Sequence, residues 1–119
     1  QIAVFVVVVA SIAEEMLTRG LLQTLLEPVR MRGLSFFKTR LSVPVLISGI
    51  VFGFLHFGLI KTGASPLFVA QIIVSTTVLG CCAGYYREKY NSLRIAIFIH
   101  AAFNALGLLL FLLSTLVKE

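Results

Sequence analysis

Four long apolar segments, separated by short charged linkers, constrain the fold of this chain more than any other feature. They cover about residues 1–26, 43–60, 67–86 and 92–117. A helix needs ~20 apolar residues to cross the hydrocarbon core of a bilayer. The sequence is 59% hydrophobic and only 13% charged, and a soluble domain of 119 residues has too little interior to bury so much apolar surface. We therefore predict an all-α, multi-pass transmembrane helix bundle with about four spanning helices.

The basic residues are distributed unevenly among the linkers, which predicts an orientation. With four spans, the first and third linkers lie on the same side of the membrane. Four bases lie within residues 27–42 and three within residues 87–94, whereas only Lys61 and Lys118 lie on the opposite side. Cytoplasmic loops of membrane proteins carry an excess of Lys and Arg. We therefore expect linker 27–42 to be cytoplasmic and the C-terminus to lie outside. The bases are interpreted as contacts with anionic lipid.

Two linkers carry local signals. Ser65 followed by Pro66 is typical of a helix N-cap with proline in the first turn, and predicts the start of the third span. In linker 27–42, Leu34, Phe36 and Phe37 alternate with basic residues. This pattern indicates either an amphipathic helix on the membrane surface or a plain loop.

Composition excludes several other classes of protein. The net charge of +5 is carried between apolar spans and not on a polar face, so no nucleic-acid partner is expected. Cys81 and Cys82 are adjacent inside an apolar run and have no metal-ligand spacing, so we interpret them as small core residues. Residues 1–119 are expected to form a single domain. Because the sequence begins at Gln1 without methionine, this domain is either a whole protein or a fragment of a longer one.

The first span carries three charges, which are costly at bilayer depth (~3 kcal/mol each) and are therefore functional candidates. Glu15 and Arg19 lie one helical turn apart, so they can neutralise each other. Glu14 is then left without a local base. One interpretation is a structural salt-bridge cluster that locks helices together, and the other is catalysis by the additional glutamate.

Polar residues also occur in two other spans. His56 lies in the second span, and His100 lies in the fourth with Asn104 one turn after it. A lone histidine in a membrane helix usually serves packing, but these residues share a depth with Glu14. Counting the helical rise from the predicted cytoplasmic ends places the four groups ~12–20 Å into the bilayer. We expect them to meet in one layer of the bundle.

This set of residues suits hydrolysis. Glu14 with His56 can activate water, while Asn104 with His100 can donate hydrogen bonds to the oxyanion. Alternatively, Glu14, His56 and His100 can ligate a zinc ion with an open position for water. The absence of aspartate excludes a paired-aspartate protease, and no HExxH motif is present. A serine nucleophile at Ser65 with His100 as its base is less favoured than a helix cap.

Three motifs carry a family resemblance. They are EEMLTR at residues 14–19, FGFLH at 52–56 and HAAFN at 100–104, which match the patterns EExxxR, FxxxH and HxxxN. In this order, on separate spans, they resemble the three signatures of the CAAX-protease and bacteriocin-processing (CPBP, or Abi) family of intramembrane peptidases. The stretch from Gly84 to His100 also resembles the family's approach to its third motif. No residue of the three motifs is missing.

The resemblance implies an integral-membrane endopeptidase, which removes the C-terminal tripeptide of prenylated CAAX proteins or matures bacterial peptides and bacteriocins. The expected partners are membrane lipid and a peptide or protein tail, in a bacterial cell membrane. The resemblance implies that Glu14 is the catalytic glutamate. It also implies supporting and partner residues: Glu15 and Arg19 support Glu14, His56 is its partner, and His100 with Asn104 completes the site.

Two points are left open by the motifs. The family is often described as metalloproteases, but our preferred mechanism uses water activated by glutamate and histidine and requires no cofactor, with zinc as the alternative. The competing functions are a catalytically inactive bacteriocin self-immunity or partner-binding protein, and a small channel or transporter fragment. The channel hypothesis lacks a pair of helices interrupted by Gly or Pro at the midplane.

Overall fold

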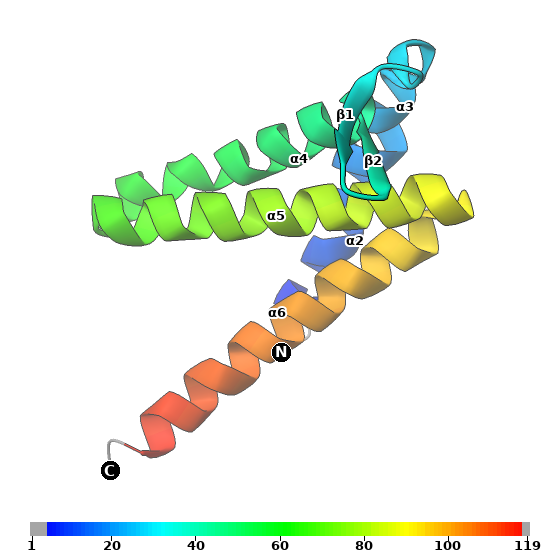
Figure 1. Ribbon diagram of the computed structural model, residues 1–119. Coiled ribbons are helices and arrows are strands. Elements are labelled where there is room, and N and C mark those ends of the chain that lie inside the picture. Colours follow the sequence, from blue (N-terminus) through cyan, green and yellow to red (C-terminus); the bar gives the residue numbers. More distant parts are fainter. Residues whose placement is uncertain (1–4, 118–119) are drawn as a thin grey trace.

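The computed structural model describes residues 5–117, and its N-terminal part is helical from Phe5 to Leu25 (Figure 1). Four elements follow one another in this segment: η1 (Phe5–Ala10), α2 (Ser11–Glu15), η2 (Met16–Leu22) and α3 (Gln23–Leu25). The residues that join them keep right-handed helical backbone angles, so we treat them as one N-terminal helix. Both η1 and η2 are wider π-helical stretches, which in other proteins often mark functional sites.

Three further helices follow. They are α4 (Val43–Leu55), which runs on into the 3₁₀ helix η4 (His56–Thr62), then α5 (Pro66–Tyr90) and α6 (Leu93–Leu116). Within residues 5–117, the helices long and apolar enough to cross a membrane are Val43–Thr62, Pro66–Tyr90 and Leu93–Leu116. They agree with the predicted spans and confirm an all-α, multi-pass architecture. The N-terminal helix carries three charged residues and is not among them, so its crossing of the membrane stays a prediction.

Two serines begin the apolar helices. The Ser42 hydroxyl accepts a hydrogen bond from the Val45 N–H at the start of α4, and the Ser65 hydroxyl accepts one from the Phe68 N–H at the start of α5, each at 3.3 Å. Such caps satisfy N–H groups that have no partner within the helix. The predicted cap at Ser65, with Pro66 in the first turn, is confirmed.

The linker between the N-terminal helix and α4 differs from both of our expectations. After the short 3₁₀ helix η3 (Glu27–Val29) it forms an antiparallel β-hairpin from β1 (Gly33–Phe36) and β2 (Thr39–Ser42), with Phe37 in the turn at φ 52°. The predicted amphipathic helix, or a plain loop, is therefore wrong here. The apolar residues at 34 and 36 recur with a period of two, which suits a strand and not a helix.

The interface between α4 and α5 is the most extensive among the described elements, and these helices lie side by side in Figure 1. Gly49 of α4 faces α5 so closely that an added Cβ would lie 2.6 Å from Cys81 Sγ. An added Cβ on Gly80 of α5 would lie 2.9 Å from Gly49 Cα. Small residues at such crossings let two membrane helices pack backbone to backbone.

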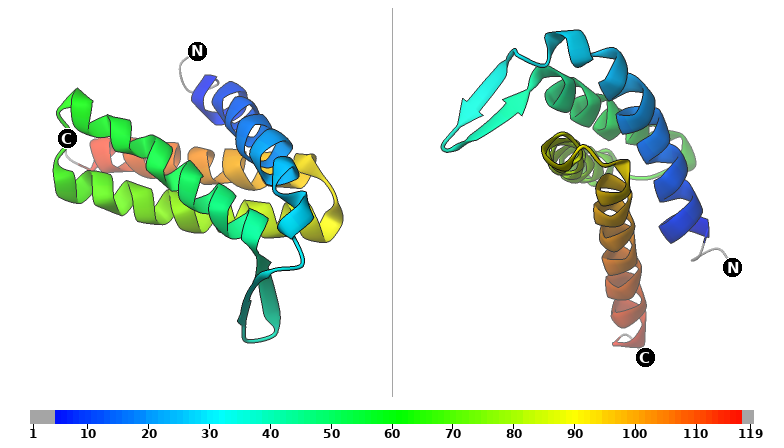
Figure 2. Two further views of the ribbon diagram at one scale, coloured as in Figure 1. Left: turned by 90° about the horizontal axis from the view of Figure 1, so that it is seen from above. Right: turned by 90° about the vertical axis from the view of Figure 1, so that its right-hand side faces the viewer.

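Helix α6 leaves this pair at an angle, and its C-terminal half extends away from the other helices (Figure 2). Its buried residues are Ala96 and His100, both in the N-terminal half. The N-terminal helix packs against α6 there and also against α4. The N-terminal helix, the pair of α4 and α5, and helix α6 therefore meet in one region, around His100.

Candidate active site

Glu15 is the centre of a buried polar cluster. Its Oε1 atom accepts a hydrogen bond from Arg19 Nη1 at 2.9 Å, and both side chains are fully buried. The same oxygen lies 3.0 Å from Nδ1 of His100 on α6. Since a carboxylate only accepts hydrogen bonds, we assign a proton to this nitrogen. Glu15 therefore joins its own helix to α6 and is enclosed on both sides.

Glu14 occupies a different environment from its neighbour. Successive helical residues point ~100° apart, so Glu14 faces away from the Arg19 pair. Its side chain is 39% exposed, and its Oε2 atom lies 3.6 Å from His100 Nε2. This separation is longer than a direct hydrogen bond. His100 thus lies between two carboxylates, and its Nε2 atom makes no direct hydrogen bond with either of them.

His56 lies at the end of α4 and faces the same space as Glu14. Both residues line a cavity of about 320 Å³ with Leu55, Gly58 and Leu59. The Nδ1 atom of His56 is 3.1 Å from the Phe52 carbonyl oxygen, which can only accept a hydrogen bond. In the neutral ring this contact leaves Nε2 as the unprotonated nitrogen. Glu14 and His56 can therefore both act on a small molecule in this cavity.

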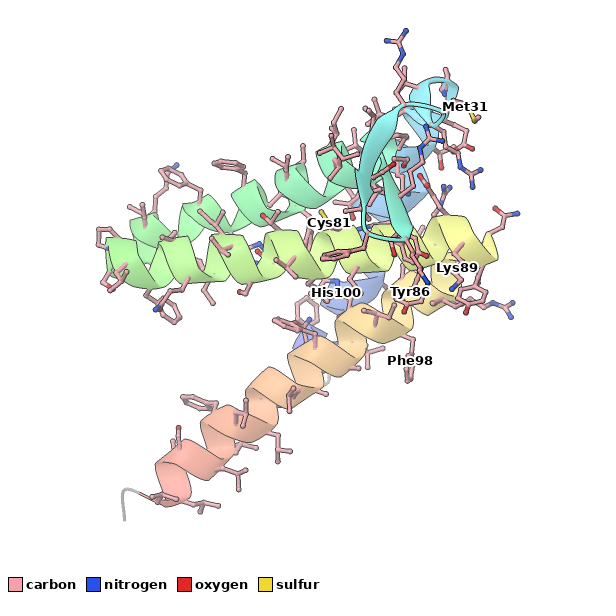
Figure 3. All side chains as sticks on the ribbon, viewed as in Figure 1. Met31, Cys81, Tyr86, Lys89, Phe98 and His100 are labelled. Atoms are coloured by element: carbon pink, nitrogen blue, oxygen red, sulfur yellow. The ribbon has the colours of Figure 1, made fainter. Side chains whose placement is uncertain are left out.

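Phe52 connects the two histidines. Its fully buried ring makes edge contacts with His56 and His100, with ring centroids 5.3 and 5.1 Å apart. The Arg19 guanidinium lies over the same ring, 4.8 Å from its centroid. No contact of Phe52 was predicted from the sequence, although its position one turn before His56 was the available signal. In Figure 3, His100 lies where α6 passes close to the other helices.

Asn104 is positioned through a residue that the sequence analysis missed. Its Nδ2 atom donates a hydrogen bond to Ser11 Oγ at 3.0 Å, and Ser11 is fully buried. Ser11 lies one turn before Glu15 on the same face of the N-terminal helix, and that spacing could have identified it. The structure thus brings Asn104 to the N-terminal helix one turn away from the Glu15–His100 contact, but not to the lining of the Glu14–His56 cavity.

Several buried polar atoms of the cluster have no hydrogen-bond partner among the described residues. They are Oε2 of Glu15 and both Nε and Nη2 of Arg19. Buried polar atoms are normally satisfied, so each exception calls for a physical cause. Here the Nη2 atom approaches Gly80, where an added Cβ would lie 2.7 Å from it. The guanidinium is therefore enclosed by close packing against α5.

The three predicted zinc ligands are not gathered into one metal-binding group among the described residues. Within residues 5–117, no three His, Cys, Asp or Glu side chains are grouped so that they could hold a metal ion. Glu14 and His56 share a cavity, whereas Nδ1 of His100 is committed to Glu15. The Nε2 atom of His100 is not part of that contact, and zinc-binding histidines often donate their other ring N–H to a carboxylate, so the zinc alternative stays a prediction.

The comparisons with known proteins gave one match. A family model described as "Type II CAAX prenyl endopeptidase Rce1-like" matches residues 1–106. Neither the curated proteins nor the solved structures contain a match to the chain. The matched range includes every residue of the cluster described above.

Proposed function

The chain belongs to the Rce1-like family of type II CAAX prenyl endopeptidases, and we propose that it hydrolyses a peptide bond near the C-terminus of a membrane-anchored protein. The three apolar helices within residues 5–117, together with the family, show that it is an integral membrane protein. One observation carries the proposed mechanism. Glu14 and His56 line a common cavity, whereas Glu15, the next residue, is sealed between Arg19 and His100.

In this proposal Glu14 is the general base. It takes a proton from a water molecule held between its carboxylate and Nε2 of His56, and the hydroxide attacks the carbonyl carbon of the substrate. Collapse of the tetrahedral intermediate breaks the C–N bond, and the proton passes from Glu14 to the leaving nitrogen. General-base catalysis of this kind typically contributes ~10²–10⁴-fold to the rate. Glu15 and Arg19 act as positioning residues for His100.

The negative charge that develops on the substrate oxygen needs hydrogen-bond donors. We assign this role to Asn104 and to Nε2 of His100, because Nδ1 of His100 already donates to Glu15. An asparagine amide cannot ionise, so it can donate throughout the reaction cycle. When the ring carries a proton on each nitrogen, Nε2 of His100 can donate to the oxyanion while Nδ1 donates to Glu15.

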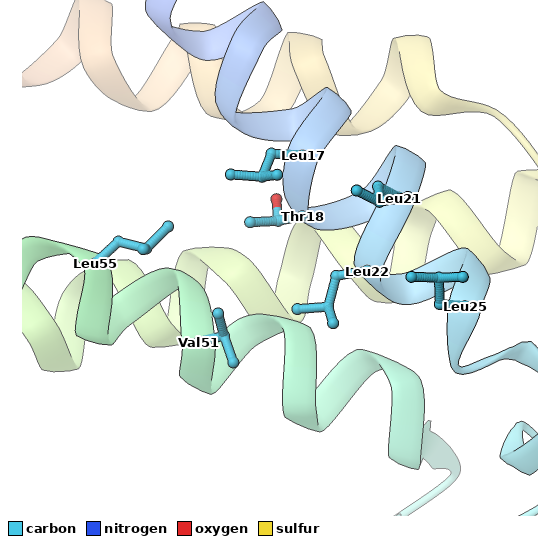
Figure 4. Close-up of a pocket in the computed structure, with 7 residues that line it drawn as sticks. All are labelled: Leu17, Thr18, Leu21, Leu22, Leu25, Val51 and Leu55. Atoms are coloured by element: carbon cyan, nitrogen blue, oxygen red, sulfur yellow. The ribbon is translucent and has the colours of Figure 1, made fainter.

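An apolar groove next to the cavity supports a lipidated substrate. It has a volume of about 250 Å³ and is lined by five leucines with Thr18 and Val51 (Figure 4). Leu55 belongs to both the groove and the Glu14–His56 cavity. We propose that a prenyl chain of the substrate lies in this groove, which would hold the adjoining peptide beside Glu14. A bacterial peptide without a lipid is the alternative substrate.

Cleavage of a reporter peptide tests the function. The purified protein in lipid nanodiscs is expected to cleave a prenylated C-terminal reporter, and Glu14→Ala is expected to abolish the cleavage. A partner-binding or immunity protein would bind the reporter without cleaving it. An ion-conducting protein would instead pass current in a bilayer. Failure of the unaltered protein to cleave either a prenylated or an unmodified reporter would contradict the proposal.

Filling the groove tests the substrate class separately. Leu21 lines the groove, so Leu21→Trp should block a prenyl chain and lower kcat/KM for the prenylated reporter by about tenfold, a loss typical of a few buried methylenes. The unmodified reporter should be cleaved as before. Val78→Trp, at a largely exposed position of α5, is the control of equal bulk and should change neither rate. Equal losses on both reporters would exclude the groove as a prenyl site.

A further inference from the structure

A second cavity lies at the other end of α5 from its N-cap, beside the hairpin. It has a volume of about 320 Å³ and is lined by Arg30, Arg40, Tyr85, Glu88 and Lys89. Three elements contribute these residues: the segment after η3, strand β2 and the last turns of α5. Figure 3 shows Tyr86 and Lys89 close together in this region. The candidate active site uses none of them.

The only acid of this cavity is already engaged. Glu88 Oε1 accepts hydrogen bonds from Gln23 Nε2 at 3.0 Å and from Ser42 Oγ at 2.7 Å, and its Oε2 lies 3.7 Å from Arg30 Nε. Arg30 also pairs with Glu27 at 2.9 Å. These contacts join the N-terminal helix, the hairpin and α5 into one fixed frame around the cavity.

The other two cations of the cavity are not neutralised. Neither Arg40 nor Lys89 forms an ion pair with any residue that the structure describes. The Lys89 ammonium instead lies 5.5–5.9 Å from the ring centroids of Tyr85, Tyr86 and Tyr90. The cavity therefore has an excess of positive charge and suits an anion. Arg40 can bind two oxygens of a phosphate, and Lys89 can add a point charge.

The surroundings of this cavity point to a membrane interface. Helix α5 is an apolar span that ends at Tyr90, and tyrosines are enriched where spans leave the hydrocarbon core. The adjoining linker exposes large apolar side chains between its bases: Met31 is 79% exposed, Leu34 65% and Phe37 93%. Apolar side chains interspersed with cations suit the boundary between headgroups and acyl chains.

We propose that this cavity binds the phosphate of an anionic phospholipid headgroup, with Arg40 and Lys89 as its ligands. The phosphate would lie between the hairpin and the end of α5, and the exposed apolar side chains of the linker would contact the acyl chains. The bound lipid would fix the hairpin on the bilayer surface. This site is independent of the proposed peptidase activity.

Lipid retention measures the site. The whole protein is placed in phosphatidylcholine nanodiscs with a small proportion of phosphatidylglycerol, and the bound lipid is identified by native mass spectrometry. The unaltered protein is expected to retain phosphatidylglycerol preferentially. Arg40→Gln with Lys89→Gln should weaken this retention about tenfold or more, as expected for the loss of two charged hydrogen-bond contacts with the phosphate. The control is Arg32→Gln with Lys38→Gln, which removes the same charge from exposed positions outside the cavity.

The outcomes separate the site from general charge effects. Retention in the control within about twofold of the unaltered protein, a change that is small on the scale of one base, supports the proposal. Equal losses in the two double variants would overturn it, because surface charge alone would then explain binding. Inorganic phosphate that binds as tightly in pure phosphatidylcholine discs would also overturn it, since the ligand would be a free anion. Thermal unfolding of each variant checks that the hairpin is intact.

Discussion

The N-terminal helix and the C-terminal half of α6 use burial in opposite ways. The N-terminal helix buries five of its polar side chains almost completely and exposes apolar ones such as Leu17 and Leu21. The buried polar residues are Ser11, Glu15, Thr18, Arg19 and Gln23, each at most 1% exposed. Beyond Asn104, in contrast, α6 is apolar and exposed over nearly its whole surface.

This difference in burial indicates which interactions fix each of the two regions in the membrane. Lipid tails solvate apolar side chains as well as protein does, so burial of leucine does little to join helices in a membrane. Charged and hydrogen-bonding groups must instead face one another, because lipid cannot satisfy them. The N-terminal helix is therefore fixed by polar pairs to α5 and α6, whereas the distal half of α6 is suited to lipid. Most polar residues of the N-terminal helix therefore mark the interior of the bundle.

Breaking the buried ion pair should give the largest effect on stability. Arg19→Ala leaves Glu15 as a buried charge without its principal partner, which typically costs ~3–5 kcal/mol. We expect the variant to accumulate poorly and to unfold at a lower temperature. The double variant Glu15→Ala with Arg19→Ala should recover part of the loss, because neither charge is then left alone. Thermal unfolding in detergent measures both.

The distal half of α6 provides the contrast for that experiment. Leu110→Ala, at a position that is 58% exposed, should change the unfolding free energy by only about 0.5 kcal/mol. If Arg19→Ala were as mild as Leu110→Ala, the two regions would not differ in the way described, and the ion pair would contribute nothing.

Asn104→Ala, which removes the side-chain amide, should lower kcat for peptide cleavage strongly with little effect on folding. Loss of one oxyanion donor typically costs ~10²–10³-fold in kcat. Ser11→Ala is the matched control, because it removes the hydroxyl that Asn104 Nδ2 contacts and leaves the amide in place. We expect Ser11→Ala to slow cleavage by less than about tenfold, well below the loss of the donor itself. Equal losses in kcat would mean that Asn104 serves packing against Ser11.

An added methyl group at the crossing of α4 and α5 should lower the free energy of unfolding by less than Arg19→Ala does. Gly80→Ala would place a Cβ 2.7 Å from Arg19 Nη2 and 2.9 Å from Gly49 Cα, and the backbone of α4 cannot move cheaply. Overpacking of this kind typically costs ~1–3 kcal/mol. Gly107→Ala in the distal half of α6 meets nothing within 4 Å and should instead stabilise the helix by roughly 0.5–1 kcal/mol. Thermal unfolding of the two variants should therefore shift in opposite directions.

The sequence predicts the spans well because hydropathy depends on one segment at a time. The predicted spans 43–60, 67–86 and 92–117 agree with the helices to within a few residues. The hairpin was missed because its strands carry only four residues each, too few to separate a period of two from an irregular linker. Its position also depends on the distant hydrogen bond between Ser42 and Glu88.

Contacts within the site were harder to predict, because they depend on how each helix rotates about its axis. The spacing of Glu15 and Arg19 predicts their pair, and the structure contains it. No spacing within one helix could predict that His100 contacts Glu15, or that the Ser11 hydroxyl accepts a hydrogen bond from Asn104. The same holds for Phe52, whose contacts come from three helices. The catalytic roles of Glu14, His56, His100 and Asn104 stay predictions.

The central claim is that the two adjacent glutamates have different functions, and paired amide substitutions test it most directly. Glu14→Gln and Glu15→Gln each remove one charge and conserve shape, and both kcat and the unfolding temperature are measured for each. Glu14→Gln should lower kcat by ~10²–10⁴-fold with an unchanged unfolding temperature, whereas Glu15→Gln should mainly lower the unfolding temperature, because Arg19 then lacks a buried counter-charge. Normal cleavage by Glu14→Gln, with activity lost only in Glu15→Gln, would contradict the account.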